Sequence, residues 1–168
     1  MEQTLILRQA TPDDAPALCD LLNAIIAIGG TTAHQTPFTV DRFRATYIDA
    51  PERISCAAAF DATGALGFQS LSWPAKGDYP VPDGWAVIGS FVRAGLQGRG
   101  IGQHLWAMTK VAARAADVHA IDATIRADNV PGLRFYSGLG FTDWDVIRAK
   151  PLRDGTPVDR IRKVLRLE

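Results

Sequence analysis

The segment from Val92 to Gly102 holds the residues best suited to bind a phosphate group. It reads Val-Arg-Ala-Gly-Leu-Gln-Gly-Arg-Gly-Ile-Gly, with glycines at 98, 100 and 102. Glycine lets a backbone turn tightly and approach a ligand without interference from a Cβ atom. A strand-like apolar run precedes the segment and a helical pattern follows it. Backbone N–H groups and the positive end of the helix dipole would therefore face one ligand, which suits a pyrophosphate.

Three phosphate-binding patterns compete for this segment. A nucleoside-triphosphate P-loop requires Lys-Ser or Lys-Thr after the glycines, and neither follows. The dinucleotide pattern G-x-G-x-x-G fits Gly98 and Gly100 but has Gln103 at its third glycine position. The pattern Q-x-x-G-x-G fits fully, through Gln97, Gly100 and Gly102. An ordinary glycine-rich turn from strand to helix is the remaining alternative.

A second segment, Asn129 to Phe141, carries a candidate proton donor. It reads Asn-Val-Pro-Gly-Leu-Arg-Phe-Tyr-Ser-Gly-Leu-Gly-Phe and follows another strand-like run. The phenol of Tyr136 can act as a general acid if a leaving group lies within about 3 Å. The alternative is a buried aromatic residue in a short helix.

Together the two segments resemble the motifs of the GCN5-related N-acetyltransferase family. The first is similar to its acyl-CoA-binding motif, and Asn129, Tyr136, Gly140 and Phe141 match its second motif. The resemblance implies direct transfer of an acetyl group from acetyl-CoA to an amine, with no covalent enzyme intermediate. It implies that Tyr136 protonates the leaving thiolate and that a strand N–H, of Phe91 or Val92, meets the oxyanion. The implied cofactor-binding residues are Phe91 and Val92 along the pantetheine arm, Gln97, Gly98, Arg99, Gly100, Ile101 and Gly102 around the pyrophosphate, and Asn129.

The general base is the open question. Many members of the family use a glutamate on the strand that here reads Trp-Ala-Val-Ile-Gly-Ser-Phe-Val over 85–92, which has no carboxylate. His34, Asp78 and Asp83 are substitutes, and a water chain ending at Ser90 is an equal alternative. Because this carboxylate is missing, a non-catalytic acyl-CoA-binding module is an alternative function. An acetyltransferase that acts on protein N-termini or lysines is another.

The polar loop of residues 31–38 narrows the resemblance to the phosphinothricin and methionine sulfoximine acetyltransferase branch. That branch acetylates the amine of small amino-acid-like molecules and implies a homodimer. We expect this loop and residues 74–84 to frame the acceptor pocket, with Trp73, Tyr79 and Trp85 as its aromatic wall. Lys76 or Arg93 would then pair with a carboxylate, and Arg93 and Arg99 are alternatives for the 3′-phosphate of the cofactor.

The pattern of the remaining chain predicts one mixed α/β domain over residues 1–168. We expect a mostly antiparallel sheet with a central parallel pair and helices on both faces, because hairpin patterns surround a β–α–β stretch over 85–126. The expected strands are 4–8, 53–60, 65–73, 85–92, 120–126, 141–148 and 161–167, and the expected helices are 11–28, 40–48, 102–116 and 131–137.

Composition excludes several classes of protein. The chain has 168 residues, 47% of them hydrophobic, with 18 basic and 18 acidic side chains. The zero net charge excludes extensive disorder and a nucleic-acid binder that relies on bulk charge. Cys19 and Cys56 fit buried positions rather than a disulfide, and no cluster has metal-ligand spacing. No signal peptide and no apolar run near 18 residues is present, so we expect a cytoplasmic protein.

Overall fold

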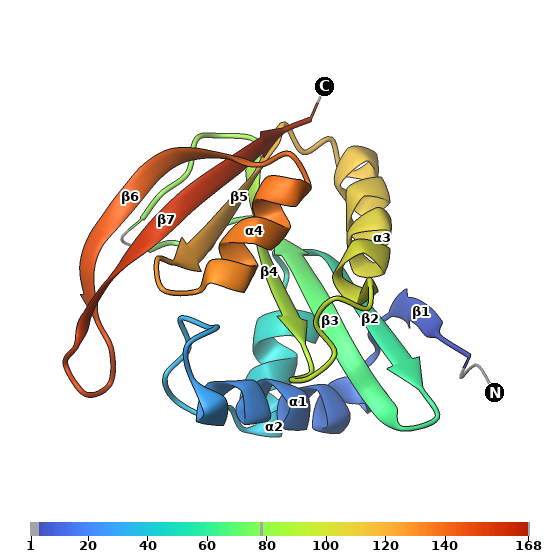
Figure 1. Ribbon diagram of the computed structural model, residues 1–168. Helices are drawn as coiled ribbons and strands as arrows, with labels where there is room; N and C mark the ends of the chain where they lie inside the picture. The colour runs from blue at the N-terminus through green and yellow to red at the C-terminus, as the bar shows by residue number, and fades with distance from the viewer. Residues whose placement is uncertain (1–3, 78, 168) are drawn as a thin grey trace.

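Seven strands form one sheet in the computed structural model, which describes residues 4–77 and 79–167. The strand order is β1-β2-β3-β4-β5-β7-β6, and only β4 and β5 pair in parallel among the described strands. Figure 1 shows the hairpin of β6 and β7 at one end of the sheet and β1 at the other. The elements are β1 (Ile6–Gln9), η1 (Pro12–Asp14), α1 (Ala15–Ile28), α2 (Val40–Phe43), η2 (Arg44–Ile48), β2 (Arg53–Asp61), β3 (Gly64–Ser72), β4 (Trp85–Val92), α3 (Ile101–Ala115), β5 (Ala120–Arg126), α4 (Val130–Gly138), β6 (Thr142–Pro151) and β7 (Pro157–Arg166).

The predicted order of elements is confirmed, and the differences lie at their ends. The predicted helix over 40–48 is α-helical only to Phe43 and then widens into η2, from which Ile48 and, in part, Tyr47 pack into the core. The last two strands are longer than predicted, because each continues past the apolar run that marked it. Backbone pairing between β6 and β7 stabilises those polar ends, from Lys150↔Val158 to Pro151↔Pro157.

Helices cover both faces of the sheet, and the alternation of side chains along β2 explains why. Cys56 and Ala58 pack with α1 and Phe43, whereas Ala57 and Ala59 pack with Ile101 and Leu105 of α3. Successive side chains of a strand point to opposite faces. α1 and α2 therefore cover one face, and α3 and α4 cover the other, where Ile121, Ala123 and Ile125 of β5 meet Tyr136. Both cysteines are buried and free, as expected.

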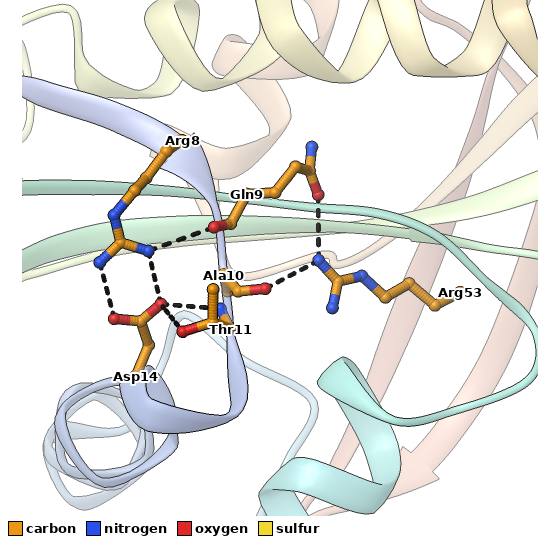
Figure 2. A network of polar contacts seen from close by, with 6 residues as sticks. All are labelled: Arg8, Gln9, Ala10, Thr11, Asp14 and Arg53. Carbon is orange, nitrogen blue, oxygen red and sulfur yellow. Dashed lines mark hydrogen bonds and ion pairs between the residues drawn. The ribbon is translucent and has the colours of Figure 1, made fainter.

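A polar network fixes the start of α1 to the sheet (Figure 2). The Asp14 carboxylate accepts two hydrogen bonds from Arg8, at 2.6 and 2.8 Å, and one from the Thr11 backbone N–H at 2.7 Å. Arg53 joins the adjacent turn by donating to the Ala10 carbonyl at 3.0 Å. The network orients α1 and so positions the polar loop that follows its last residue.

Candidate active site

The parallel strands β4 and β5 separate halfway along their length. Their pairing runs from Trp85↔Ala120 to Ile88↔Ala123, although β4 continues to Val92 and β5 to Arg126. The sheet is therefore open between Gly89–Val92 on one side and Thr124–Arg126 on the other. This is the place where a ligand can cross from one face of the sheet to the other.

A cavity of about 810 Å³ occupies the open part of the sheet and extends over both faces. On the α3 side its wall is the glycine-rich turn, the start of α3 and α4. On the α1 side its wall is the loop after α1, together with Tyr47. The lining includes Thr31, Thr32, Ala33, His34, Tyr47, Val87, Ile88, Gly89, Ser90, Phe91, Val92, Gln97, Gly98, Gly100, Ile101, Gly102, Gln103, Thr124, Ile125, Arg126, Asn129, Arg134, Phe135 and Tyr136.

The glycine-rich turn ends at the N-terminus of α3, as the sequence predicts. Gly100 is the N-cap and adopts a left-handed conformation, φ +78°. Its carbonyl accepts from the His104 N–H, so the N–H groups of the first helical turn remain available to an anion. A Cβ atom at Gly102 would lie 2.7 Å from the Phe135 ring, so this glycine is required for the packing of α3 on α4. The turn thus forms a cradle for an anion.

The side chains around that cradle do not all face it. The Gln97 side chain accepts from the Gly95 N–H at 3.0 Å and so stabilises the turn itself. Arg93 turns away toward the β2–β3 hairpin, where it donates to the Thr63 hydroxyl at 3.1 Å. Arg99 is exposed and is absent from the lining, whereas the exposed Arg134 of α4 lines it. Arg93 therefore does not line the cavity, contrary to the prediction.

The register of β3 and β4 decides which backbone groups of β4 are free. The Arg93 N–H donates to the Leu66 carbonyl on β3 at 2.8 Å. Because hydrogen-bonding directions alternate along an antiparallel strand, the N–H and C=O of Phe91 also face β3, opposite Phe68. Those of Ser90 and Val92 face the opening. This corrects the expectation for Phe91, whose backbone is occupied by the sheet and whose ring lines the cavity instead.

Tyr136 reaches the opening from α4, where it is 6% exposed. Its hydroxyl lies 2.7 Å from the Ser90 Oγ, which also accepts from the Gln69 side-chain amide at 2.8 Å. Burial, the largest effect, raises the pKa of Tyr136 to about 12. The phenol therefore stays protonated at neutral pH, as a proton donor must.

Asn129 performs two structural roles at the cavity wall. Its Oδ1 accepts from the Gly132 N–H at 3.1 Å and caps α4, and its Nδ2 donates to the Thr31 carbonyl at 3.3 Å. The Arg126 guanidinium donates to the Thr32 carbonyl at 3.2 Å. These bonds tie the loop after α1 to the far side of the opening. The predicted contact of Asn129 with the cofactor stays a prediction.

His34 is the predicted substitute base that lies in the cavity. Its Nε2 is 2.8 Å from the Tyr47 hydroxyl, and its ring lies against Phe91. Burial and then the charges of Arg42 and Arg160 lower the pKa of His34, so its imidazole is neutral at neutral pH. Burial likewise raises the pKa of Tyr47. A neutral imidazole beside the open sheet can accept a proton.

Other predicted site residues lie elsewhere. Asp83 is exposed and outside the cavity lining, and Asp78 lies outside the described residues. Trp85 is buried against Trp144, with ring centroids 5.0 Å apart, so it is not an acceptor wall. The exposed Lys76 does not line the cavity.

The residues that sequence reasoning missed are Gln69, Tyr47 and Arg126. Gln69 interrupts an apolar strand, and Arg126 ends β5 at the place where β5 has separated from β4. The signals for Gln69 and Arg126 are visible in the sequence. Nothing in the sequence indicates that Tyr47 lies next to His34. Within 4–77 and 79–167, no three His, Cys, Asp or Glu side chains gather as a metal site, and no helix there could cross a membrane.

Comparison with known proteins agrees with this geometry. The chain matches the acetyltransferase (GNAT) family over residues 22–141. It belongs to that family and is an acetyltransferase of the GNAT fold. It is 29% identical over 140 residues, 80% of each chain, to phosphinothricin N-acetyltransferase of Streptomyces coelicolor.

Solved structures share the fold over almost the whole chain. An N-acetyltransferase from Staphylococcus aureus Mu50 superposes with a TM-score of 0.85 at 20% identity, covering 98% of this chain and 99% of that one. The Salmonella typhimurium protein yncA, solved with its cofactor acetyl-CoA, gives a TM-score of 0.79 at 20% identity, covering 98% and 95%. At these identities the likeness concerns the fold.

Proposed function

We propose that this acetyltransferase moves the acetyl group of acetyl-CoA to the primary amine of a small amino-acid-like acceptor. The observation that carries the proposal is the opening between β4 and β5. It joins an anion cradle on the α3 side to a pocket with a neutral histidine on the α1 side. A cofactor and an acceptor can therefore meet within the sheet, each held by a different face.

The cofactor half of the proposal rests on backbone groups. The turn from Gln97 to Gly102 would hold the pyrophosphate through its N–H groups and the dipole of α3. The free groups of Ser90 and Val92 would pair with the amides of the pantetheine arm. Arg134 is the cation of the lining best placed to add charge near the phosphates. Family membership and the acetyl-CoA bound to the Salmonella protein support this choice of cosubstrate.

The chemical half assigns one proton transfer to each side of the opening. His34 would take a proton from the acceptor ammonium, so that the amine nitrogen can attack the thioester carbonyl. The N–H of Val92, which faces the opening, would stabilise the oxyanion that develops there. As the C–S bond breaks, Tyr136 would give its proton to the thiolate. The acylated nitrogen would then release its second proton, which restores the phenol. Ser90 can donate to Tyr136 while accepting from Gln69, which leaves the phenol proton directed at the sulfur.

The acceptor class rests on the pocket and on one relative. The acceptor side is bounded by the loop after α1, which Arg126 and Asn129 tie across the opening. The Streptomyces coelicolor relative carries the name phosphinothricin N-acetyltransferase. Both favour a compact acceptor, such as phosphinothricin or methionine sulfoximine, over a protein N-terminus or lysine. A single domain over 1–168, a homodimer and a cytoplasmic location remain predictions from the sequence and the resemblance.

An acceptor panel tests the proposal. Release of free CoA is measured with methionine sulfoximine, phosphinothricin, a histone-like peptide and an aminoglycoside, and product acetylation is verified by mass. We expect both amino-acid analogues to have the higher kcat/KM. A tenfold preference for a peptide or aminoglycoside, about 1.4 kcal/mol of transition-state discrimination, would refute the acceptor class. CoA binding without release for any amine would favour the non-catalytic binding module.

A further inference from the structure

A second, smaller cavity adjoins the first on the acceptor side of the sheet. It encloses about 240 Å³ and shares three lining residues, Val87, Ile88 and Thr124, with the larger cavity. Asp122, Thr124 and Arg126 alternate with the residues of β5 that pack on α3 and α4, so they point to the α1 side. The small cavity therefore extends the acceptor pocket and is separate from the cofactor cradle. Its other lining residues are Tyr79, Asp122, Ile147, Arg160 and Arg162.

Arg160 is the half-buried cation of this small cavity that lacks an anionic partner among the described residues. It stands directly opposite Arg126 in the pairing of β5 and β7, so the two side chains share a face. Arg126 is paired with Asp128 at 2.7 Å. No ion pair or hydrogen bond joins Arg160 to any side chain within 4–77 and 79–167.

The nearby carboxylates are already engaged by other groups. Asp122 accepts from the Trp144 indole at 2.9 Å and from the Thr124 hydroxyl at 2.8 Å, and Arg162 lies 3.5 Å from it. Asp159, next to Arg160 in sequence, bonds to Arg148 and to the Ala149 N–H. A partly desolvated guanidinium without a counterion is costly unless something binds it. Burial, and to a smaller extent the charge of Arg126, lower the pKa of Arg160.

The position of Arg160 relative to His34 suits a bifunctional acceptor. Arg160 stands opposite Arg126, whose guanidinium donates to the Thr32 carbonyl at 3.2 Å. The Thr32 hydroxyl accepts from the His34 N–H at 3.1 Å, so Arg160 and His34 flank the same loop. β7 lies beside β5, which forms one edge of the opening, and neighbouring strands are about 4.8 Å apart. A short molecule can therefore span from the open sheet to Arg160. Its amine would lie near His34 and its anionic end near the guanidinium.

We propose that Arg160 binds the carboxylate of the amino-acid-like acceptor and thereby selects it. This inference rests on the proposed acetyl transfer and assigns its anion-recognition residue, in place of the Lys76 and Arg93 that the sequence suggested. The planar guanidinium matches a carboxylate with two parallel hydrogen bonds, and the small cavity has room for that group. Arg160 acts in binding and contributes no proton transfer.

The test compares enzyme variants with acceptors that differ only at the carboxyl group. Methionine sulfoximine and its carboxyl amide are assayed with the wild type, Arg160→Gln, Arg160→Lys and Arg166→Gln. Arg166 lies on the same strand and outside both cavities, so its variant controls for the loss of one positive charge. We expect Arg160→Gln to raise KM for the free acid about 10- to 100-fold and KM for the amide less than about threefold. Arg160→Lys should restore part of the loss, and Arg166→Gln should change neither value.

Binding measurements separate this inference from the proposed function. If the wild type transfers acetyl to neither acceptor, the proposed function fails. In that case the Kd of each acceptor for the CoA-loaded protein is measured by calorimetry. We expect Arg160→Gln to raise the Kd of the acid much more than the Kd of the amide. Equal losses for acid and amide in Arg160→Gln, or no loss for the acid, would overturn the assignment. So would a wild-type protein that binds the amide as tightly as the acid.

Discussion

The hydroxyl groups of Ser90 and Tyr136 lie 2.7 Å apart and join the free half of β4 to α4. Ser90 belongs to the strand whose backbone faces the opening, and Tyr136 belongs to the helix that closes the cofactor side. The bond therefore fixes the phenol relative to the place where a thioester would lie. The Gln69 side-chain amide donates to the Ser90 hydroxyl at 2.8 Å and so fixes Ser90 from the other side.

Removal of the Tyr136 hydroxyl should slow the chemical step. In Tyr136→Phe the ring still fills its buried site, so we expect normal acetyl-CoA affinity and a kcat lower by roughly 10- to 1,000-fold. Ser90→Ala keeps the phenol but releases it from the chain, so its kcat should fall less. Stopped-flow measurement of a single turnover provides the rate of chemistry. An unchanged single-turnover rate in Tyr136→Phe would exclude the phenol as the acid.

The pH profile of kcat should have an acid limb that belongs to His34. A base must be deprotonated, so activity should fall as pH drops through the pKa of His34, which burial places below the usual value near 6.5. Because kcat at saturating acceptor reports groups in the complex, the free acceptor amine does not contribute to it. His34→Gln should lower kcat and remove the limb. His104→Gln, an exposed change on α3, is the matched control.

Two neighbours of His34 should modify that limb. Arg42 lowers the pKa of His34 through its charge, so Arg42→Gln should move the limb to higher pH. Tyr47→Phe removes the hydroxyl that lies 2.8 Å from the Nε2 atom and should lower kcat by releasing the ring. A limb that stays in place in both Arg42→Gln and His34→Gln would belong to another group.

A charge at the anion cradle should weaken cofactor binding more than the matched neutral change. Gly100 is left-handed, so valine there would strain the backbone and confuse binding with stability. Asn and Asp both tolerate this conformation, and a Cβ atom would meet only the Gln103 side chain, at 3.6 Å. We expect Gly100→Asp to bind CoA at least about tenfold more weakly than Gly100→Asn, less so at high salt. If calorimetry gives the two variants equal affinities for CoA, the pyrophosphate does not bind at this turn.

The network at the start of α1 should make stability depend on pH in acid (Figure 2). Hydrogen bonds from Arg8, the largest effect, lower the pKa of Asp14 from 3.8 to about 2. A carboxylate with a lowered pKa stabilises the fold fully above its unfolded value, and this contribution is lost as pH falls from about 4 to about 2. With screening at the half-exposed Arg8, we expect about 1–2 kcal/mol.

The variant Asp14→Asn should isolate that contribution. Its melting temperature should be lower than that of the wild type at pH 6, and the difference should shrink toward pH 2. Asp13→Asn changes the exposed neighbouring carboxylate and serves as the control. A constant difference between Asp14→Asn and wild type from pH 6 to pH 2 would contradict the role of the ion pair.

Local patterns in the sequence were sufficient for the order of helices and strands and for the glycine-rich turn that begins α3. Strand and helix periodicity, the Gly98–Gly102 turn and the Asn129–Phe141 segment each depend on neighbours along the chain. Tyr136 and the glycines are therefore predictable, because one strand–turn–helix unit builds the cradle and the next supplies the phenol. The resemblance to the family depends on the same contiguous residues.

Only the tertiary structure decided the acceptor side. His34 was one of several candidate bases in the sequence. Its position in the cavity, beside the Tyr47 hydroxyl and the Phe91 ring, depends on contacts with η2 and β4. The free N–H of Val92 follows from strand register, which single-residue patterns do not encode. Whether an arginine is paired also depends on distant partners, since Arg93 bonds to a hairpin and Arg160 faces a cavity. Sequence determines which charges exist, and the packing of segments far apart in the chain determines which of them remain available to a substrate.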